Sequence, residues 1–524
     1  MQHSKGFIRY QIRTDKKTNS EYGTFCHAER VDGVKKNNDK WLGRVIDKEK
    51  GIFFTKKNSY YKFSVIEGFI ALKDDEKKVY LANDNSKISK RSHGNNKEIK
   101  KSKSISFGKI FIIYEYLKNI GLFDIFKKAY EKDTETLLSL IMFRLLNDKA
   151  NLYAFNWWDK SYAKYIFPNA KLQSKKISEF IISLGSENNF REFFSNYFEY
   201  INKNTENSNI LIDSTGLTND IKIPMTLFNN YNGKLSNELR LIVVTDKTHG
   251  FPIYYRYVPG NIVDVCTLYL IINELKEYKV NIDKLILDAG YYSEDNIAEL
   301  LKNNINFMTK MVPRKGLYHQ LILEHVPNLK NEKNYVNFGC RHLYIKKTII
   351  DLFKSKLPVY AFICLDVAKQ HIAELEYLNN FYILENNNND KKRFLIDELK
   401  QGVFILITTF DITKDEVLPT YYTRQSIEQI FDYLRNETTM LPIKDHSEEA
   451  FSGHLFISFM ATIAFIALAK QLKQNNISIA VALDELSYLN GREYNNKIIP
   501  DIATKNVNNI AKCLNIKIPK KIKL

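Results

Sequence analysis

The run NILID at 209–213 opens a series of short apolar segments that decides the fold. RLIVVTD at 240–246 and FPIYYRYV at 251–258 follow it, and KLILD at 284–288 and INFMTKMV at 305–312 come later. Short runs rich in Ile, Val and Tyr between turn residues predict strands, and the apolar spacing between the third and fourth runs predicts a helix. The predicted order is three strands, a helix, a strand, a second helix and a strand.

This order is compatible with a ribonuclease H-like layered α/β domain, because strands that alternate with helices favour a sheet covered by helices. Before this stretch, apolar residues recur at helical spacing from Phe107 to Ile201, and short strand-like runs occupy roughly the first 85 residues. We therefore expect the fold class to be α/β. A ribonuclease H-like catalytic domain would carry a mixed, strand-containing insertion, and a β-rich N-terminal unit and a helical region would precede it.

Shifts in composition and pattern suggest seven segments. A small β-rich unit at 1–86 with a possible role in DNA binding is followed by a basic linker at 87–106 and a helical DNA-binding region at 107–205. The catalytic domain is expected in two parts, 206–312 and 413–474, which flank an insertion subdomain at 313–412, and a basic tail is expected at 475–524.

The chain has 524 residues and a formal net charge of +17, with 44% hydrophobic residues, which describes a folded basic protein. A polyanionic partner would explain the charge, although solubilising surface charge would also explain it. The five cysteines form no CxxC pair, which favours a reducing compartment. The N-terminus lacks an apolar signal region, and the longest apolar run, 455–469, is shorter than the roughly 20 residues of a membrane span. We expect a cytoplasmic protein.

Two aspartates follow predicted strands and are candidates for a shared acidic site. Asp213 ends the run Asn-Ile-Leu-Ile, and Asp288 ends Lys-Leu-Ile-Leu. Ligands of α/β proteins tend to bind at the carboxyl ends of strands, so the two carboxylates would converge if their strands are neighbours. An aspartate before Ser or Gly is also a common turn residue, so this pair alone does not decide the function.

A third element lies at 421–435 and has the spacing Tyr-x2-Arg-x3-Glu-x6-basic. On one continuous helix, Tyr421, Arg424, Glu428 and Arg435 would share a narrow stripe, and Ile427 with Phe431 would face the core. An ordinary amphipathic helix with a salt-bridged surface would have a similar pattern.

This spacing resembles the Tyr-Arg-Glu-Lys signature of DDE transposases from bacterial insertion sequences, in the insertion-sequence-four superfamily. IDST at 212–215 and LDAGY at 287–291 resemble the two aspartate motifs of that family. PGN at 259–261 with Asp264 resembles the turn between them, and HLFISFMA at 454–461 resembles the apolar helix after the glutamate. The chain has Arg435 where the family usually has Lys, which keeps the charge but changes its shape.

The resemblance implies that Asp213, Asp288 and Glu428 are catalytic and hold two Mg²⁺ ions, with Mn²⁺ as a possible substitute. It also implies that Tyr421, Arg424 and Arg435 contact DNA phosphates. The activity implied is binding of terminal inverted repeats, followed by phosphodiester hydrolysis and transesterification. The partners implied are double-stranded DNA of the transposon ends and target, and a second copy of the chain in a homodimer.

A basic segment adds a separate candidate for DNA binding, although a solvated linker would have the same composition. Its candidate residues are Lys97, Lys100, Lys101 and Lys103. Two other functions remain open. One is a ribonuclease H-like nuclease without strand transfer, and the other is an inactive, domesticated transposase that only binds DNA.

Overall fold

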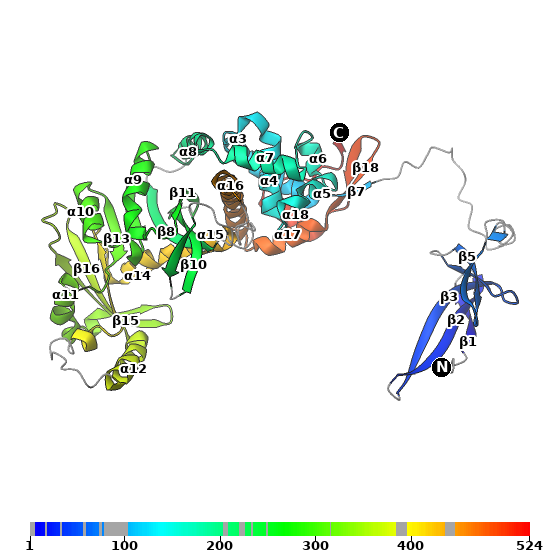
Figure 1. The fold of residues 1–524 in the computed structure, drawn as a ribbon, viewed down its shortest axis with the longest axis horizontal. Helices are drawn as coiled ribbons and strands as arrows, with labels where there is room; N and C mark the ends of the chain where they lie inside the picture. The colour runs from blue at the N-terminus through cyan, green and yellow to red at the C-terminus, as the bar shows by residue number, and fades with distance from the viewer. Residues whose placement is uncertain are drawn as a thin grey trace. The chain divides into compact units, whose positions relative to one another are not determined.

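The computed structural model describes residues 6–524 except 16–17, 32–33, 56–58, 73–75, 78–102, 203–207, 219–225, 232–233, 248–249, 315, 384–395 and 435–445. The chain divides into two compact units, Met1–Ile99 and Lys100–Leu524, called here the N-terminal unit and the main unit (Figure 1).

The N-terminal unit consists of one antiparallel sheet in which each strand pairs with the next along the chain. The strands are β1 (Phe7–Asp15), β2 (Thr18–Val31), β3 (Val34–Asp47), β4 (Ile52–Thr55), β5 (Ser59–Ser64) and β6 (Gly68–Ala71). Its core is small and consists of Leu42, Phe53, Tyr61 and Phe63. The described residues of this unit are therefore rich in strands, as the sequence pattern indicates, while a role in DNA binding stays a prediction.

The main unit begins with a helical region. It contains α2 (Gly108–Asn119), α3 (Leu122–Lys127), α4 (Thr134–Leu146), α5 (Ala154–Asp159), α6 (Ala163–Ile166), α7 (Ser174–Leu184) and α8 (Glu187–Asn202). The long helix α16 (Glu448–Lys473) packs against α4 and α7 and joins this region to the central sheet (Figure 1). Of the helices that the structure describes, α16 alone is long and apolar enough to cross a membrane, and 78% of its most apolar stretch is buried inside the protein.

One boundary differs from the sequence prediction, because the last residues of the expected basic linker form a strand, β7 (Lys103–Ser106). The expected basic tail contains both helices and strands. The tail forms α17 (Ile479–Ser487), β18 (Asn490–Tyr494), β19 (Lys497–Pro500), α18 (Lys505–Cys513) and β20 (Ile522–Lys523). β7 pairs with β18, and apolar residues spaced along the polar sequence, such as Ile498 and Val507, are buried. The pairing uses backbone groups, so the basic side chains gave no signal of it.

A ten-stranded mixed sheet forms the centre of the main unit, in the order β11-β10-β8-β12-β13-β17-β16-β15-β14, with β9 paired to β10. The strands are β8 (Ser208–Thr218), β9 (Leu227–Tyr231), β10 (Lys234–Asp246), β11 (Pro252–Pro259), β12 (Ile282–Leu287), β13 (Asn306–Lys310), β14 (Tyr335–Phe338), β15 (Arg341–Ile350), β16 (Val359–Asp366) and β17 (Val403–Thr408). β8, β12 and β13 run parallel to one another, and the other neighbours are antiparallel.

The sequence predicts a strand-containing insertion at 313–412, and the structure shows that the strands of this segment extend the central sheet. β17 pairs directly with β13, and β16, β15 and β14 continue outward from it. The helices associated with the sheet are α9 (Leu268–Glu277), α10 (Glu294–Lys302), α11 (Leu317–His325), α12 (Val367–Ile383), α14 (Lys414–Tyr422) and α15 (Ser426–Asp432). Short apolar runs predict strands but not their partners, so the shared sheet was not predictable from the pattern.

Helices α7 and α16 approach each other so closely that glycine is required at the contact. A Cβ atom at Gly453 of α16 would lie 2.0 Å from the carbonyl oxygen of Ile181. A Cβ atom at Gly185, which follows α7, would lie 2.0 Å from the carbonyl oxygen of Glu449. Backbone atoms cannot rotate away as a side chain can, so this crossing depends on both glycines.

We predict that Gly453→Ala lowers the thermal unfolding midpoint. In an unconstrained helix interior this change would stabilise the protein by about 1 kcal/mol. Here the added methyl group must push α7 away from α16, so we expect a net loss of about 1 to 3 kcal/mol in the free energy of unfolding. A raised midpoint in calorimetry would show that the two helices are not in contact through these glycines.

Candidate active site

The pairing of two parallel strands brings Asp213 and Asp288 together. Ile212 of β8 is the partner of Leu287 of β12, and each aspartate is the next residue along its strand. β12 ends at this point, whereas β8 continues, so both carboxylates lie where the parallel pairing stops. Their side chains are 15% and 38% exposed, so the pair is partly shielded from water.

Backbone and side-chain donors fix the two aspartates locally. Oδ1 of Asp213 accepts a hydrogen bond from the backbone N–H of Ser214 at 2.9 Å. Oδ1 of Asp288 accepts one from the N–H of Ala289 at 2.7 Å and thereby caps the 3₁₀ turn η4 (Ala289–Tyr291). With each Oδ1 engaged in this way, the Oδ2 atoms are left to interact with a cation.

The guanidinium of Arg424 is that cation. Its Nη1 lies 3.1 Å from Oδ2 of Asp213 and 3.1 Å from Oδ2 of Asp288. The hydroxyl of Tyr421 donates to Oδ1 of Asp288 at 3.4 Å, and the Arg424 guanidinium lies 5.6 Å from the centre of the Tyr421 ring. The structure therefore brings four predicted site residues together: Arg424 contacts both aspartates, and Tyr421 contacts Asp288.

The segment that carries Arg424 is not one continuous helix, which corrects the stripe expected from the sequence. α14 ends at Tyr422, the 3₁₀ turn η7 (Thr423–Gln425) follows, and α15 starts at Ser426. A capping box formed by Thr413 and Glu416 starts α14. The tighter turn changes the rotation between Tyr421 and the residues of α15, so a regular 100° step does not describe the segment.

Glu428 lies on α15 with an exposed side chain, while Ile427 and Phe431 on the same helix are buried, as predicted. Glu428 acts electrostatically on Arg424 and raises its pKa together with the two aspartates. Among the described residues, no three acidic, histidine or cysteine side chains are close enough to hold one metal ion. Asp213 and Asp288 thus form the acidic pair, and Glu428 does not join them in a three-residue cluster in the described part of the chain.

The remaining predicted DNA contacts are not at this site or lie outside the described residues. Arg435, Lys97, Lys100 and Lys101 fall outside the residues that the structure describes. Lys103 lies on β7, where its ammonium is 3.8 Å from a carboxylate oxygen of Asp159. A role for these residues in DNA binding stays a prediction.

Burial dominates the ionisation of Asp213. Desolvation raises its pKa from 3.8 to about 6, and repulsion from Asp288 and Asp264 acts in the same direction. Attraction by Arg424 and the hydrogen bond from Ser214 lower the pKa but do not offset the burial. The folded protein therefore binds a proton at Asp213 more tightly than the unfolded chain does. Its contribution to stability is present below about pH 4 and is lost as the pH rises through about 6.

We predict that Asp213→Asn stabilises the metal-free protein at pH 8, because it removes a poorly solvated charge. The pKa shift corresponds to a gain of about 1 to 3 kcal/mol above pH 6, shrinking towards zero near pH 4. Thermal unfolding of both proteins across this range in the presence of a chelator measures the effect. A lower midpoint for the variant at pH 8 would show that the Arg424 ion pair outweighs the burial of Asp213.

A second ion pair, which was not predicted from the sequence, lies beside Asp213 and Asp288. Nη1 of Arg240 is 2.6 Å from Oδ1 of Asp264, and the hydroxyl of Ser214 donates to the same oxygen at 2.6 Å. A Cβ at Gly290 would lie 2.8 Å from the other oxygen of Asp264. Asp264 therefore contacts the residue after Asp213 and packs against the turn after Asp288. The sequence did contain a signal for this ion pair, because Arg240 is a charged residue at the start of an otherwise apolar run.

We predict that Asp264→Asn weakens binding of Mn²⁺ by about tenfold, because residues that orient metal ligands typically contribute that much. Isothermal titration of the folded variant measures the affinity. Glu274→Gln is the matched control, since Glu274 of α9 forms a comparable 2.8 Å ion pair with Arg256 of β11. Equal losses of Mn²⁺ affinity in the two variants would show that Asp264 contributes only to general stability.

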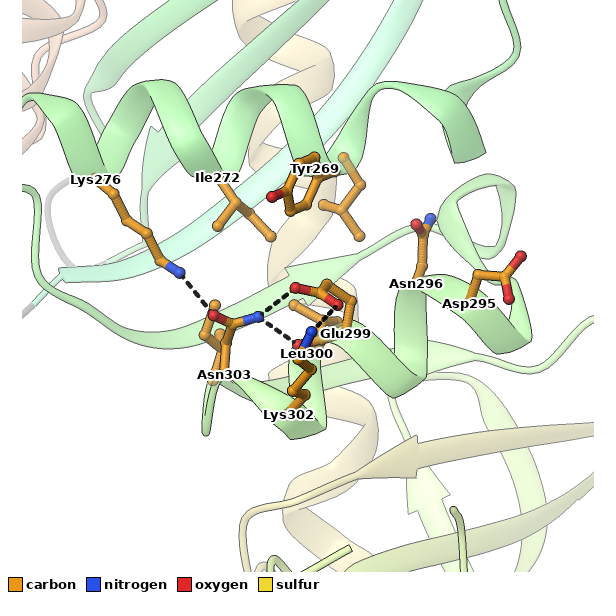
Figure 2. Close-up of a pocket in the computed structure, with 11 residues that line it drawn as sticks. Tyr269, Ile272, Lys276, Asp295, Asn296, Glu299, Leu300, Lys302 and Asn303 are labelled. Carbon is orange, nitrogen blue, oxygen red and sulfur yellow. Dashed lines mark hydrogen bonds and ion pairs between the residues drawn. The ribbon is translucent and has the colours of Figure 1, made fainter.

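A pocket of about 360 Å³ lies between α9 and α10 and does not include the two aspartates (Figure 2). Several of its polar groups contact one another. Lys276 donates to Asn303 at 3.2 Å, Asn303 donates to Glu299 at 2.8 Å, and Lys302 lies 3.6 Å from Glu299. None of the predicted site residues that the structure describes lines this pocket.

Two carboxylates on neighbouring parallel strands that share one cation define an acidic site of the kind that metal-dependent phosphodiester chemistry uses. Residues 205–464 match the family model described as the transposase DDE domain. The chain is a DDE-type transposase enzyme, and this family generally uses divalent metal ions.

Among solved structures, the chain is similar to one titled as the cryo-EM structure of the piggyBac transposase synaptic complex with hairpin DNA. The identity is 9%, the match covers 79% of this chain and 82% of that one, and the TM-score is 0.38. No curated protein matches this chain in sequence.

Proposed function

We propose that this transposase binds the terminal inverted repeats of a bacterial insertion sequence, cuts the DNA at their ends and joins the 3′-hydroxyls to target DNA. The position of one cation between Asp213 and Asp288 is the observation that carries the proposal. We further assign the chain to the insertion-sequence-four superfamily, on the spacing of Tyr421, Arg424 and Glu428.

A ribonuclease H-like catalytic domain is supported by the strand order of one half of the sheet. Three antiparallel strands, β11, β10 and β8, are followed by β12 and β13, which run parallel to β8. The antiparallel strands come first in the chain, and the first of them, β8, pairs with the first parallel strand. This places the first aspartate on the central strand and the second on its neighbour.

The residues present fit divalent metal ions. Carboxylate oxygens are the ligands that Mg²⁺ prefers, and the contact of both Oδ2 atoms with a guanidinium shows that they favour a cation between them. Asp213 and Asp288 would hold the ions, Mg²⁺ or Mn²⁺, and Glu428 would complete the ligand set. Two such ions supply an activated nucleophile and a stabilised leaving oxygen for attack on phosphorus.

The protein's own residues would position the DNA. Once its two carboxylates bind metal, Arg424 is available to donate to the phosphate oxygens beside the scissile bond, as a planar guanidinium does well. The Tyr421 hydroxyl, which contacts Asp288, lies at the same point. Ser214 and Asp264 would keep strand β8 in place at Asp213 while the substrate binds.

The net charge of +17 supports double-stranded DNA as the partner. We further propose that two copies of the chain form a homodimer that holds both transposon ends, and that the protein acts in the bacterial cytoplasm, at the nucleoid when bound to DNA.

We predict that Asp213→Asn, Asp288→Asn and Glu428→Gln each abolish cleavage while DNA binding persists, because each removes a metal-binding charge with little change of shape. Asp283→Asn, on the same strand β12 but near its other end, is the matched control and should cleave normally. The assay uses DNA flanking the gene, with Mg²⁺ and a supercoiled target plasmid. Wild-type cleavage by any of the three variants would remove that residue from the metal site.

The same assay separates the alternative functions. Cleavage without joined products would indicate a nuclease that only hydrolyses. Binding without cleavage by the wild-type chain would indicate an inactive, domesticated transposase.

A further inference from the structure

A second group of charged side chains, all basic, lies beside Asp288. Met308 of β13 is the parallel partner of Ile286 on β12, so Lys310 stands next to Asp288, two residues further along each strand. Side chains two residues apart on a strand point to the same face. The side chains of Lys310 and Asp288 therefore point to the same face of the sheet, at the C-terminal ends of β13 and β12.

Two more basic residues, Arg341 and Lys369, contact the buried carboxylate of Asp366 at the end of β16. Nε and Nη2 of Arg341 both donate to Oδ2 of Asp366, at 2.9 and 2.7 Å. The other oxygen of Asp366 accepts the backbone N–H of Lys369, in the first turn of α12, at 3.2 Å. Asp366 neutralises Arg341, but it holds Lys369 only through the backbone, so the Lys369 side chain remains exposed.

Lys310 and Lys369 form no ion pair with any carboxylate in the described part of the chain. The Lys310 ammonium lies 5.7 Å from the centre of the Phe404 ring, and its side chain is partly buried. Burial lowers the pKa of Lys310, and the positive charges of Lys369, Arg424 and Arg341 lower it further, against the attraction of Asp288. The one carboxylate near Lys310 is already shared with Arg424. This region has unpaired positive charge, which an anion would neutralise.

We propose that Lys310 and Lys369 bind backbone phosphates of the DNA strand as it leaves the catalytic carboxylates and crosses the sheet edge towards α12. The proposal rests on the proposed function. β17 separates β13 from β16, and Lys310 is level with Phe362, four residues before β16 ends at Asp366. The two strand ends are therefore about 16 Å apart, or roughly five nucleotides at the rise of duplex DNA. The expected occupant is therefore a continuous polyanion whose phosphates are regularly spaced.

This path gives the strands of the insertion a role in the reaction. β16 and α12 carry Lys369 and the buried Asp366 that orients Arg341, and they are part of the same sheet as the aspartates. Because the sheet is continuous, the distance from the metal site to these lysines is set by strand spacing and not by a hinge.

The test measures binding of a labelled duplex that contains the mapped cleavage site, in Ca²⁺, by fluorescence anisotropy. Single phosphates within about seven nucleotides of the site are replaced by neutral methylphosphonates. For the wild-type chain we expect about a tenfold loss at two positions, since a hydrogen bond between charged groups contributes about that much. In Lys310→Ala one position should lose its effect, in Lys369→Ala the other, and Lys310→Arg should behave as wild type.

Lys284→Ala is the matched control. Lys284 lies on β12, nearer the opposite end of the neighbouring parallel strand, with its ammonium 5.4 Å from the centre of the Phe410 ring. It should keep the wild-type response at every phosphate. Lys369 is exposed, so its replacement is expected to leave the fold intact even if Lys310→Ala does not fold.

The outcomes separate the two proposals. If the wild-type chain binds the duplex and both lysine variants respond like Lys284→Ala, the phosphate path is wrong and the proposed function stands. If the wild-type chain binds no duplex at all, the proposed function fails. If inorganic phosphate at micromolar concentration protects Lys310 from acetylation while the duplex does not, the site binds a small anion and the proposal is overturned.

Discussion

The parallel pairing of Ile212 with Leu287 is the contact on which the site depends, because it places two carboxylates side by side at the end of β12. Like charges this close, one of them largely buried, oppose folding. The structure offsets the repulsion with a single guanidinium that touches both carboxylates. The apolar strands that cause the pairing are buried on both faces, with Ile210, Leu211 and Ile212 fully inaccessible to solvent, so the register cannot slip without exposing the core.

Charges of opposite sign follow one another outward from this pair. Arg424 lies against the two aspartates, Arg240 compensates Asp264 beside them, and Arg341 compensates Asp366 at the next strand ends. Closely spaced like charges lower the free energy of unfolding when no ligand is bound, and active sites commonly reduce stability in this way. Metal and DNA would then replace interactions that the free protein makes within itself.

The existence of the strands was predictable, because each apolar run is bounded by turn residues, but their neighbours were not. Asp213 and Asp288 could be proposed as a pair only on the assumption that β8 and β12 are adjacent, which the register establishes. The stripe of Tyr421, Arg424 and Glu428 assumed a regular helix, and the 3₁₀ turn at Thr423–Gln425 changes their relative orientation. The motif identified Arg424 as a cation of the site. The spacing of the motif could not show that Arg424 contacts the two aspartates in the free protein.

Anomalous diffraction from crystals soaked in Mn²⁺ would test the central claim, that the carboxylates of Asp213 and Asp288 form one cation site that Arg424 occupies in the free protein. The account predicts anomalous peaks within bonding distance of both Oδ2 atoms, with the guanidinium of Arg424 moved away from them. Peaks elsewhere, with Arg424 still bridging the two aspartates at saturating Mn²⁺, would contradict it.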